Sequence, residues 1–381
     1  MTKRLAPSPI ASSLLLLATL VFGCSGGGGG GNGGEAGTGA GGSSGSTATC
    51  DAASLEGCDY PSRGLSITVR DQVAITDSVT GRTLPLLVRI PDVPGPLPLV
   101  IWSHGGGFND AGHRLSVEWG ETLAAHGYVV VHIAHVTPDA TALAALCTLA
   151  AIPTAECLPP AGDADSTGLF ALVKTRDVIA VLDQLPMLSQ ASEAQGGPAI
   201  DLSRVAVAGW SAGSRAPLIT HGAVFYPSPS APKLSLEHSL PAAAIVVSPV
   251  APGYAGFFEE ADDDTWVHTR GPILTLTGHN DLQAAKPDLT GEGRRIAYER
   301  QPADGTRWLL FSNLDGVGSH TTFSLDDLGS SDERLLRLSH ALQASARAFL
   351  DATLDGDAEA RAYLSSGNAA VLAGDASWDH H

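Results

Sequence analysis

Hydrophobic and polar positions alternate with two different periods from about residue 65 onward. Short apolar or β-branched runs, typical of strands, cover residues 65–69, 83–90, 96–102, 128–133, 204–208, 243–247, 273–277 and 308–311. Runs with helical periodicity cover residues 117–126, 168–185, the segment from 212 onward, 296–300 and 335–350. This alternation predicts an α/β fold with a mostly parallel central sheet and helices on both faces.

One connection in this pattern is much longer than the others. Residues 137–166 follow a predicted strand end, where most strand–helix connections take only a few residues. The segment carries Cys147 and Cys157 among apolar residues. Functional sites in open parallel sheets form at the carboxyl ends of strands. We therefore predict that this segment is a disulfide-stapled cap over a functional site at that end of the sheet. A surface insertion that never contacts substrate is the alternative.

The first residues have the pattern of an export signal. Lys3 and Arg4 precede an apolar run over residues 14–22, which is too short to span a bilayer. The run ends next to Cys24, in a string that resembles the lipobox of bacterial lipoproteins. We therefore predict a signal peptide over residues 1–23 and lipidation of Cys24. An ordinary cleaved signal with an incidental cysteine is the alternative.

Residues 24–49 read as a tether between this lipid and a catalytic domain over residues 50–381. They are almost all Gly, Ser, Ala and Thr, a composition that buries nothing and remains coil. About 25 such residues have an end-to-end distance of roughly 28 Å. The predicted location is therefore outside the cytoplasm, with the lipid anchor in the outer membrane or at the cell surface.

Five cysteines fit an oxidising compartment. With Cys24 assigned to lipid, an even number remains, and disulfides are the usual interpretation. Three pairings are open, and pairing of neighbours is the simplest: Cys50–Cys58 and Cys147–Cys157. None has histidines at zinc-site spacing, so we predict no metal.

Composition narrows the choice of partners. Apolar residues make up 44% of the 381 positions, enough for a sizeable core, and the formal net charge is −18. Basic residues are few and scattered, which argues against nucleic acid and against attraction to anionic lipid. The expected partner is a small or lipid-like molecule, with the membrane reached only through the anchor.

The most specific motif is Gly209-Trp210-Ser211-Ala212-Gly213, between a predicted strand and a predicted helix. In a nucleophile elbow the serine sits on a strained turn, and side chains at either glycine position would collide with backbone. The motif therefore marks Ser211 as a nucleophile. A glycine-rich turn in a binding protein is the alternative.

A serine hydroxyl needs a base, and the base needs an orienting acid. Asp281 follows the strand at 273–277 and His320 follows the strand at 308–311, in the order acid then histidine. We predict these two as the partners of Ser211. The weaker rivals are His279, which precedes the acid, His340 inside the last helix, Asp315 only five positions before the histidine, and the acidic run 262–264.

An oxyanion hole is predicted from a second glycine-rich segment. His104-Gly105-Gly106-Gly107 ends an apolar strand, where glycine lets backbone approach a tetrahedral oxygen closely. We assign the two amide donors to Gly106 and Ala212. A plain loop is the alternative interpretation of residues 104–107.

Residues from about 65 to 364 resemble the α/β-hydrolase superfamily, and within it the bacterial relatives of dienelactone hydrolases and platelet-activating-factor acetylhydrolases, a group that shades into polyester-cleaving cutinase-like enzymes. The motifs that carry the likeness are Ser103-His104-Gly105-Gly106, the run 126–130, Arg176-Asp177-Val178, Leu182-Asp183, the serine elbow, Ser248-Pro249 and the run 277–281. Two positions depart from these relatives: residues 248–252 hold no acid where acetylhydrolases tend to have one, and the nucleophile is not the cysteine of dienelactone hydrolases proper.

The resemblance implies a Ser–Asp–His triad that works without a cofactor. The expected activity is hydrolysis of carboxylic esters through an acyl-enzyme. Acetylhydrolase or lipase activity, lactone opening and polyester cleavage on the same triad are alternatives. A non-catalytic, surface-anchored binding module is a further one, because a fold does not fix a function.

Overall fold

The computed structural model describes residues 59–157, 168–250, 264–282, 290–367, 374 and 376–381, all within one compact unit, Thr47–His381. The predicted signal peptide, Cys24, the linker, Cys50, Cys58 and residues 158–166 of the cap lie outside the described residues. Within the described ranges, no helix is both long and apolar enough to cross a membrane.

A nine-stranded mixed sheet forms the centre of this unit, in the order β1-β2-β4-β3-β5-β8-β9-β10-β11. Its six central strands run parallel, while β1, β2 and β11 make antiparallel pairs toward the two edges. The strands are β1 (Ile67–Thr76), β2 (Thr83–Pro91), β3 (Leu97–Ser103), β4 (Val129–Ile133), β5 (Ile200–Trp210), β8 (Ala243–Val247), β9 (Ile273–Gly278), β10 (Arg307–Ser312) and β11 (Ala376–His380). A separate hairpin pairs β6 (Val224–Phe225) with β7 (Leu234–Ser235).

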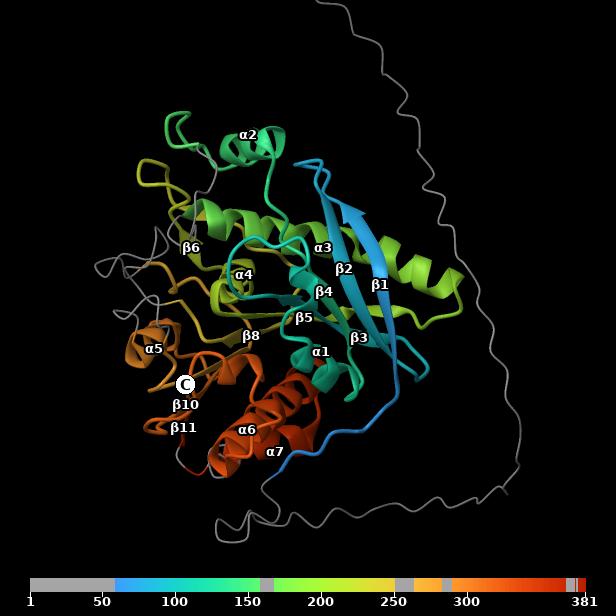
Figure 1. Cartoon of the computed structure of the whole chain (residues 1–381), viewed down its shortest axis with the longest axis vertical. Helices are drawn as coiled ribbons and strands as arrows, with labels where there is room; N and C mark the ends of the chain where they lie inside the picture. Colours follow the sequence, from blue (N-terminus) through green and yellow to red (C-terminus); the bar gives the residue numbers. More distant parts are fainter. Residues whose placement is uncertain (1–58, 158–167, 251–263, 283–289, 368–373, 375) are drawn as a thin grey trace, which may run out of the picture. The chain divides into compact units, whose positions relative to one another are not determined.

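Helices cover both faces of the sheet (Figure 1). One face packs against α1 (Val117–Ala124), α6 (Glu333–Leu350) and α7 (Ala358–Ser366). The other packs against α3 (Gly168–Ala194) and α4 (Arg215–Thr220), with α5 (Gly291–Glu299) on the same side. Every residue of β3, β4, β8 and β9 is buried, as expected for strands covered on both faces.

The predicted α/β class is confirmed, and several predicted boundaries are corrected. β1 runs to Thr76, beyond the predicted end at residue 69, because it pairs with β2 along most of its length. The helix predicted from 212 begins instead as the 3-10 turn η3 (Ser211–Ser214). The sequence pattern did not predict β11 or α7.

The described part of the long insertion forms a helix and contains the predicted disulfide. α2 (Ala140–Leu149) begins at Asp139, whose carboxylate accepts hydrogen bonds from two first-turn amides. Cys147 and Cys157 are bonded, which confirms one of the predicted pairs. Leu146 is fully buried in an apolar cluster shared with α3 and α4. The insertion is therefore fixed to the helices on one face of the sheet.

The first described residues are fixed to the opposite face through Asp351, which begins the short π-helical turn after α6. Its carboxylate accepts hydrogen bonds from the hydroxyls of Tyr60 and Tyr128, at 2.8 and 2.6 Å, and contacts His126 Nε2 at 2.9 Å. Arg63 adds an ion pair at 3.2 Å. These donors hold the pKa of Asp351 at about 2, although burial alone would raise it.

Candidate functional site

Ser211 stands on a strained turn at the carboxyl end of β5. Its φ of 54° lies in the left-handed region that side chains rarely adopt. The two glycines of the motif are sterically required, because a Cβ on Gly209 would lie 2.3 Å from Gly213 O. A Cβ on Gly213 would lie 2.1 Å from Ser103 O. The sequence thus forces the tight turn that lifts the Ser211 side chain off the end of the strand.

His320 reaches Ser211 from the loop that follows β10. Its Nε2 lies 2.7 Å from Ser211 Oγ, within hydrogen-bond distance. The Trp210 ring lies beside the imidazole, 5.0 Å between centroids, and its indole nitrogen donates to the His320 carbonyl. Ser211 and His320 are both mostly buried, with 8% and 7% of their surfaces exposed.

Asp281 contacts the other nitrogen of the same imidazole. Its Oδ1 lies 2.6 Å from His320 Nδ1, and its Oδ2 accepts a hydrogen bond from the Thr277 hydroxyl at 2.8 Å. The carboxylate is fully buried. Burial alone would raise the pKa of Asp281, but the positive charge of Arg294 and the bond to His320 hold it below its ordinary value. Asp281 is therefore ionised at neutral pH.

The ionised carboxylate of Asp281 orients the His320 ring and selects which nitrogen carries the hydrogen that faces it. His320 Nδ1–H donates to Asp281, which leaves Nε2 to accept the proton of the Ser211 hydroxyl. The three side chains come from loops after β9 and β10 and from the turn after β5, which all meet at one edge of the parallel sheet. This arrangement can transfer a proton from a serine hydroxyl to a histidine.

The loop after β3 lies against the turn that carries Ser211. β3 and β5 are parallel neighbours, with Ser103 opposite Gly209. A Cβ on Gly105 would lie 2.2 Å from the Trp210 ring, so the loop and the turn are in close contact. The loop could not approach this closely with a side chain at Gly105.

The structure places both predicted oxyanion donors beside this contact. Gly106 has a φ of 68° and open space where a side chain would point. Ala212 is the second residue of η3, so its amide precedes the first bonded amide of that turn. Among backbone carbonyls of the described residues, none accepts a hydrogen bond from Gly106. Their role as donors to a reacting oxygen stays a prediction.

Two aromatic side chains pack near Ala212. The rings of Phe108 and Phe170 lie 4.7 Å apart between centroids. Phe170 is fully buried and packs with Ala212, and the partly buried Phe108 packs against this pair. Phe108 also packs against the apolar cluster that contains Leu146 of α2. Phe108 therefore joins the cluster that includes α2 to the pair beside the Ser211 turn, while residues 158–166 lie outside the described residues.

The rival residues occupy other positions. His279 is half exposed and pairs with Glu292 at 3.4 Å, while His340 and Asp315 are exposed. Of the acidic run 262–264, only Asp264 is described, and it is exposed and lies 3.5 Å from Lys233. Among the described residues, no cluster of histidine, cysteine and carboxylate side chains is arranged to hold a metal.

Sequence reasoning missed Arg294, which contacts Asp281 from α5. Its Nε lies 3.2 Å from Asp281 Oδ1 and donates to the Asp281 carbonyl at 2.9 Å. Its Nη1 donates to the carbonyls of Ser248 and Pro249 at 3.0 and 2.9 Å. Two adjacent arginines, Arg294 and Arg295, stand in the sequence, and only the fold shows which one turns inward.

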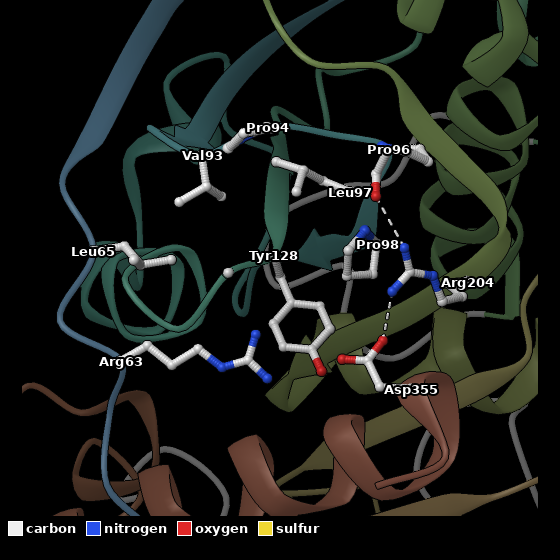
Figure 2. A pocket seen from close by; sticks show the side chains of 11 residues that line it. Arg63, Leu65, Val93, Pro94, Pro96, Leu97, Pro98, Tyr128, Arg204 and Asp355 are labelled. Carbon is white, nitrogen blue, oxygen red and sulfur yellow. Dashed lines mark hydrogen bonds and ion pairs between the residues drawn. The ribbon is translucent and has the colours of Figure 1, made fainter. Parts of the chain in front are cut away.

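A cavity of about 330 Å³ lies at the opposite edge of the sheet (Figure 2). Its walls include Leu97, the first residue of β3, and Tyr128, which precedes β4. Arg204 on its rim is paired with Asp355 and donates to the Pro96 carbonyl. Since β3 spans seven residues, this cavity is separated from the Ser211 edge by about 20 Å of strand. It takes no part in the site.

No protein-family model matches the chain, and a search of curated proteins finds no match in sequence.

Proposed function

We propose that the protein is a serine hydrolase of the α/β-hydrolase fold that cleaves carboxylic esters through an acyl-enzyme. The observation that carries the proposal is the hydrogen-bonded chain from Ser211 through His320 to Asp281, with contacts of 2.7 and 2.6 Å. Strand order, serine turn and the chain order serine, acid, histidine support the same assignment.

In the proposed cycle, Ser211 Oγ attacks the ester carbonyl carbon while His320 Nε2 takes the hydroxyl proton. Asp281 stabilises the imidazolium that forms. The amides of Gly106 and Ala212 stabilise the negative oxygen of the tetrahedral intermediate. Collapse expels the alcohol, which takes the proton from His320. A water then attacks the acyl carbonyl carbon while His320 takes one of its protons. The second tetrahedral intermediate collapses, Ser211 Oγ leaves with the proton from His320, and the carboxylic acid is released.

The site supports hydrolysis better than a purely binding role. The strained φ of Ser211 costs free energy that a binding surface does not need. The partly buried ring of Phe108, near Ala212, suits an apolar acyl or alcohol group. Lactones, acetyl esters and polyesters present the same carbonyl and stay alternative substrates.

The location remains a proposal from the sequence alone: export, with a lipid on Cys24 and a tether over residues 25–49. Growth of cells that express the full chain with an alkyne-labelled fatty acid should label the protein, and Cys24→Ala should abolish the label. Labelling that survives this substitution would contradict the assignment of the anchor.

Covalent labelling tests the proposed nucleophile directly. A fluorophosphonate should react with the purified domain, and peptide mapping should place the adduct on Ser211. Ser211→Ala should abolish both the label and turnover of a short-chain ester. The matched control is Ser203→Ala, an exposed serine near the start of β5. Turnover retained by Ser211→Ala, or no adduct on the folded wild-type protein, would overturn the proposal.

A further inference from the structure

A second chain of serine, histidine and carboxylate lies beside the site. Ser103 Oγ is 2.8 Å from His135 Nε2, and His135 Nδ1 is 2.9 Å from Asp177 Oδ2. Arg82 extends the chain by donating to Asp177 Oδ1 at 2.8 Å. Ser103, His135 and Asp177 have no exposed surface at all. No substrate can reach the Ser103 hydroxyl, so this chain is not a second catalytic centre.

The protonation of this chain follows from its surroundings. Burial, and then the nearby positive charge of Lys174, lower the pKa of His135 well below its ordinary value, so the ring is neutral. Burial raises the pKa of Asp177 to about 7, against the opposing charge of Arg82. In its ionised form, Asp177 accepts from Arg82, and its other oxygen accepts the Nδ1–H of His135. His135 Nε2 then accepts the Ser103 hydroxyl proton. Ser103, His135 and Asp177 are thus joined by hydrogen bonds within the buried interior, which restrains all three side chains.

His135 also contacts the glycine-rich loop through its backbone. Its amide donates to His104 Nε2 at 3.4 Å, and its carbonyl accepts from the Asn109 amide at 2.9 Å. His135, two residues after β4, therefore contacts Ser103 just before the loop, His104 at its first residue and Asn109 at its end. Lys174 donates to the His104 carbonyl at 2.6 Å from the α3 side.

We propose that His135 is a positioning residue that holds residues 104–109 so that the Gly106 amide faces the reacting carbonyl. This inference rests on the proposed function. It follows from geometry: Ser103, His104 and Asn109 bracket Gly106, and His135 contacts all three. A donor displaced by about 1 Å stabilises a developing oxyanion poorly, and the rate falls by roughly a hundredfold.

The test is His135→Asn assayed with a matched ester and thionoester. Asparagine keeps an N–H for Asp177 but offers no acceptor at the position of Nε2. We expect kcat for the ester to fall roughly 10- to 100-fold with KM little changed. Sulfur is a weak hydrogen-bond acceptor, so thionoester turnover gains little from the oxyanion donors. The ratio of ester to thionoester rates should therefore fall in the variant.

Two further variants separate positioning from general damage. His126→Asn alters an equally buried histidine that also lies 2.9 Å from an aspartate, Asp351, away from the loop. It should leave the ester-to-thionoester ratio at the wild-type value. Ser103→Ala removes one hydroxyl only, so it remains informative if His135→Asn does not fold. We expect it to lower the ratio in the same direction by a smaller factor.

The outcomes distinguish this inference from the proposed function. A wild-type protein without a fluorophosphonate adduct on Ser211 would remove the function and this inference together. An active wild-type protein whose ratio is unchanged in His135→Asn, or in Ser103→Ala where the former is unfolded, would overturn the positioning role alone. The pH dependence of kcat should be unchanged, because the Ser211, His320 and Asp281 side chains are not altered.

Discussion

Arg294 and Asp281 are paired inside the protein, with Arg294 Nε 3.2 Å from Asp281 Oδ1 and both side chains almost fully buried. The same nitrogen donates to the backbone carbonyl of Asp281. The arginine therefore fixes the position of the carboxylate and also stabilises its charge.

Loss of this arginine should shift the acid limb of the pH profile. The pKa of Asp281 is held below its ordinary value, so its charged form persists on the acid side. In Arg294→Met, burial dominates and the pKa of Asp281 rises by roughly 1 to 3 units. A smaller fraction of Asp281 is then ionised to orient His320, so kcat/KM should fall most at the acid end of the profile. Measurement of kcat/KM against pH checks this. Arg295→Met, on the partly exposed neighbour that pairs with Glu299 and Asp379, is the control and should leave the profile unchanged.

An unchanged acid limb in Arg294→Met would show that Arg294 does not stabilise the ionised form of Asp281. The profile of Arg294→Lys should lie between those of the wild type and Arg294→Met, because lysine returns the positive charge without the planar pair of donors.

Substitution of Gly213 should destabilise the turn that carries Ser211. A Cβ there would lie 2.1 Å from Ser103 O and 2.5 Å from His104 O, both backbone atoms that cannot rotate away. We expect Gly213→Ala to lower the free energy of unfolding by roughly 1 to 3 kcal/mol or more, measured by urea denaturation. Gly329→Ala has nothing within 4 Å of its new Cβ, so its effect should stay within about 0.5 kcal/mol. Equal effects of the two substitutions would contradict the steric argument.

Reduction of the Cys147–Cys157 disulfide should loosen the insertion. The bond closes a loop with a sequence separation of 10, for which chain entropy predicts at most about 3 kcal/mol. Hydrogen exchange of α2 amides should quicken on reduction, while amides of β5 and β8 should hardly change. The double variant Cys147→Ala, Cys157→Ala should exchange at the fast rate with or without reductant. Protection of α2 that is the same before and after reduction would mean that packing alone holds it.

Asp351 should contribute stability that depends on pH. On folding, the pKa of Asp351 falls from 3.8 to about 2. Its contribution to the free energy of unfolding is therefore complete at pH values above the unfolded-state pKa, and it is lost as the pH falls through about 2. We expect Asp351→Asn to cost about 2–4 kcal/mol at pH 7, and less as the pH approaches 2. Urea denaturation across this range checks both parts. Asp355→Asn breaks a more exposed pair with Arg204 and should cost about 1 kcal/mol or less.

Much of the candidate site follows from strand ends that the sequence reveals. Ser211, Asp281 and His320 each come soon after an apolar run, and the carboxyl ends of parallel strands meet at one edge. Their proximity could therefore be predicted without coordinates. Their distances could not, because these depend on how far each loop carries its side chain back over the sheet.

The remaining features leave little trace in a pattern of apolar positions. β11 is a polar segment that pairs with β10 through its backbone, with His380 stacked on Trp308 at 4.8 Å between centroids. Arg294 and His135 are polar side chains whose burial is decided by partners distant in sequence. A buried arginine cannot be told from an exposed one by its neighbours in sequence.

The bonds that Asp351 forms with Tyr60 and Arg63 also have a mechanical consequence. The chain reaches the sheet through Tyr60 and Arg63, and both are bonded to Asp351 before β1 begins. A pull on the chain at Asp59 therefore loads the end of α6 through these bonds before it reaches the edge strand β1. With the lipid anchor proposed at Cys24, drag on the domain would be borne by a cross-link between the first described residues and the last long helix, and β1 would be shielded from peeling.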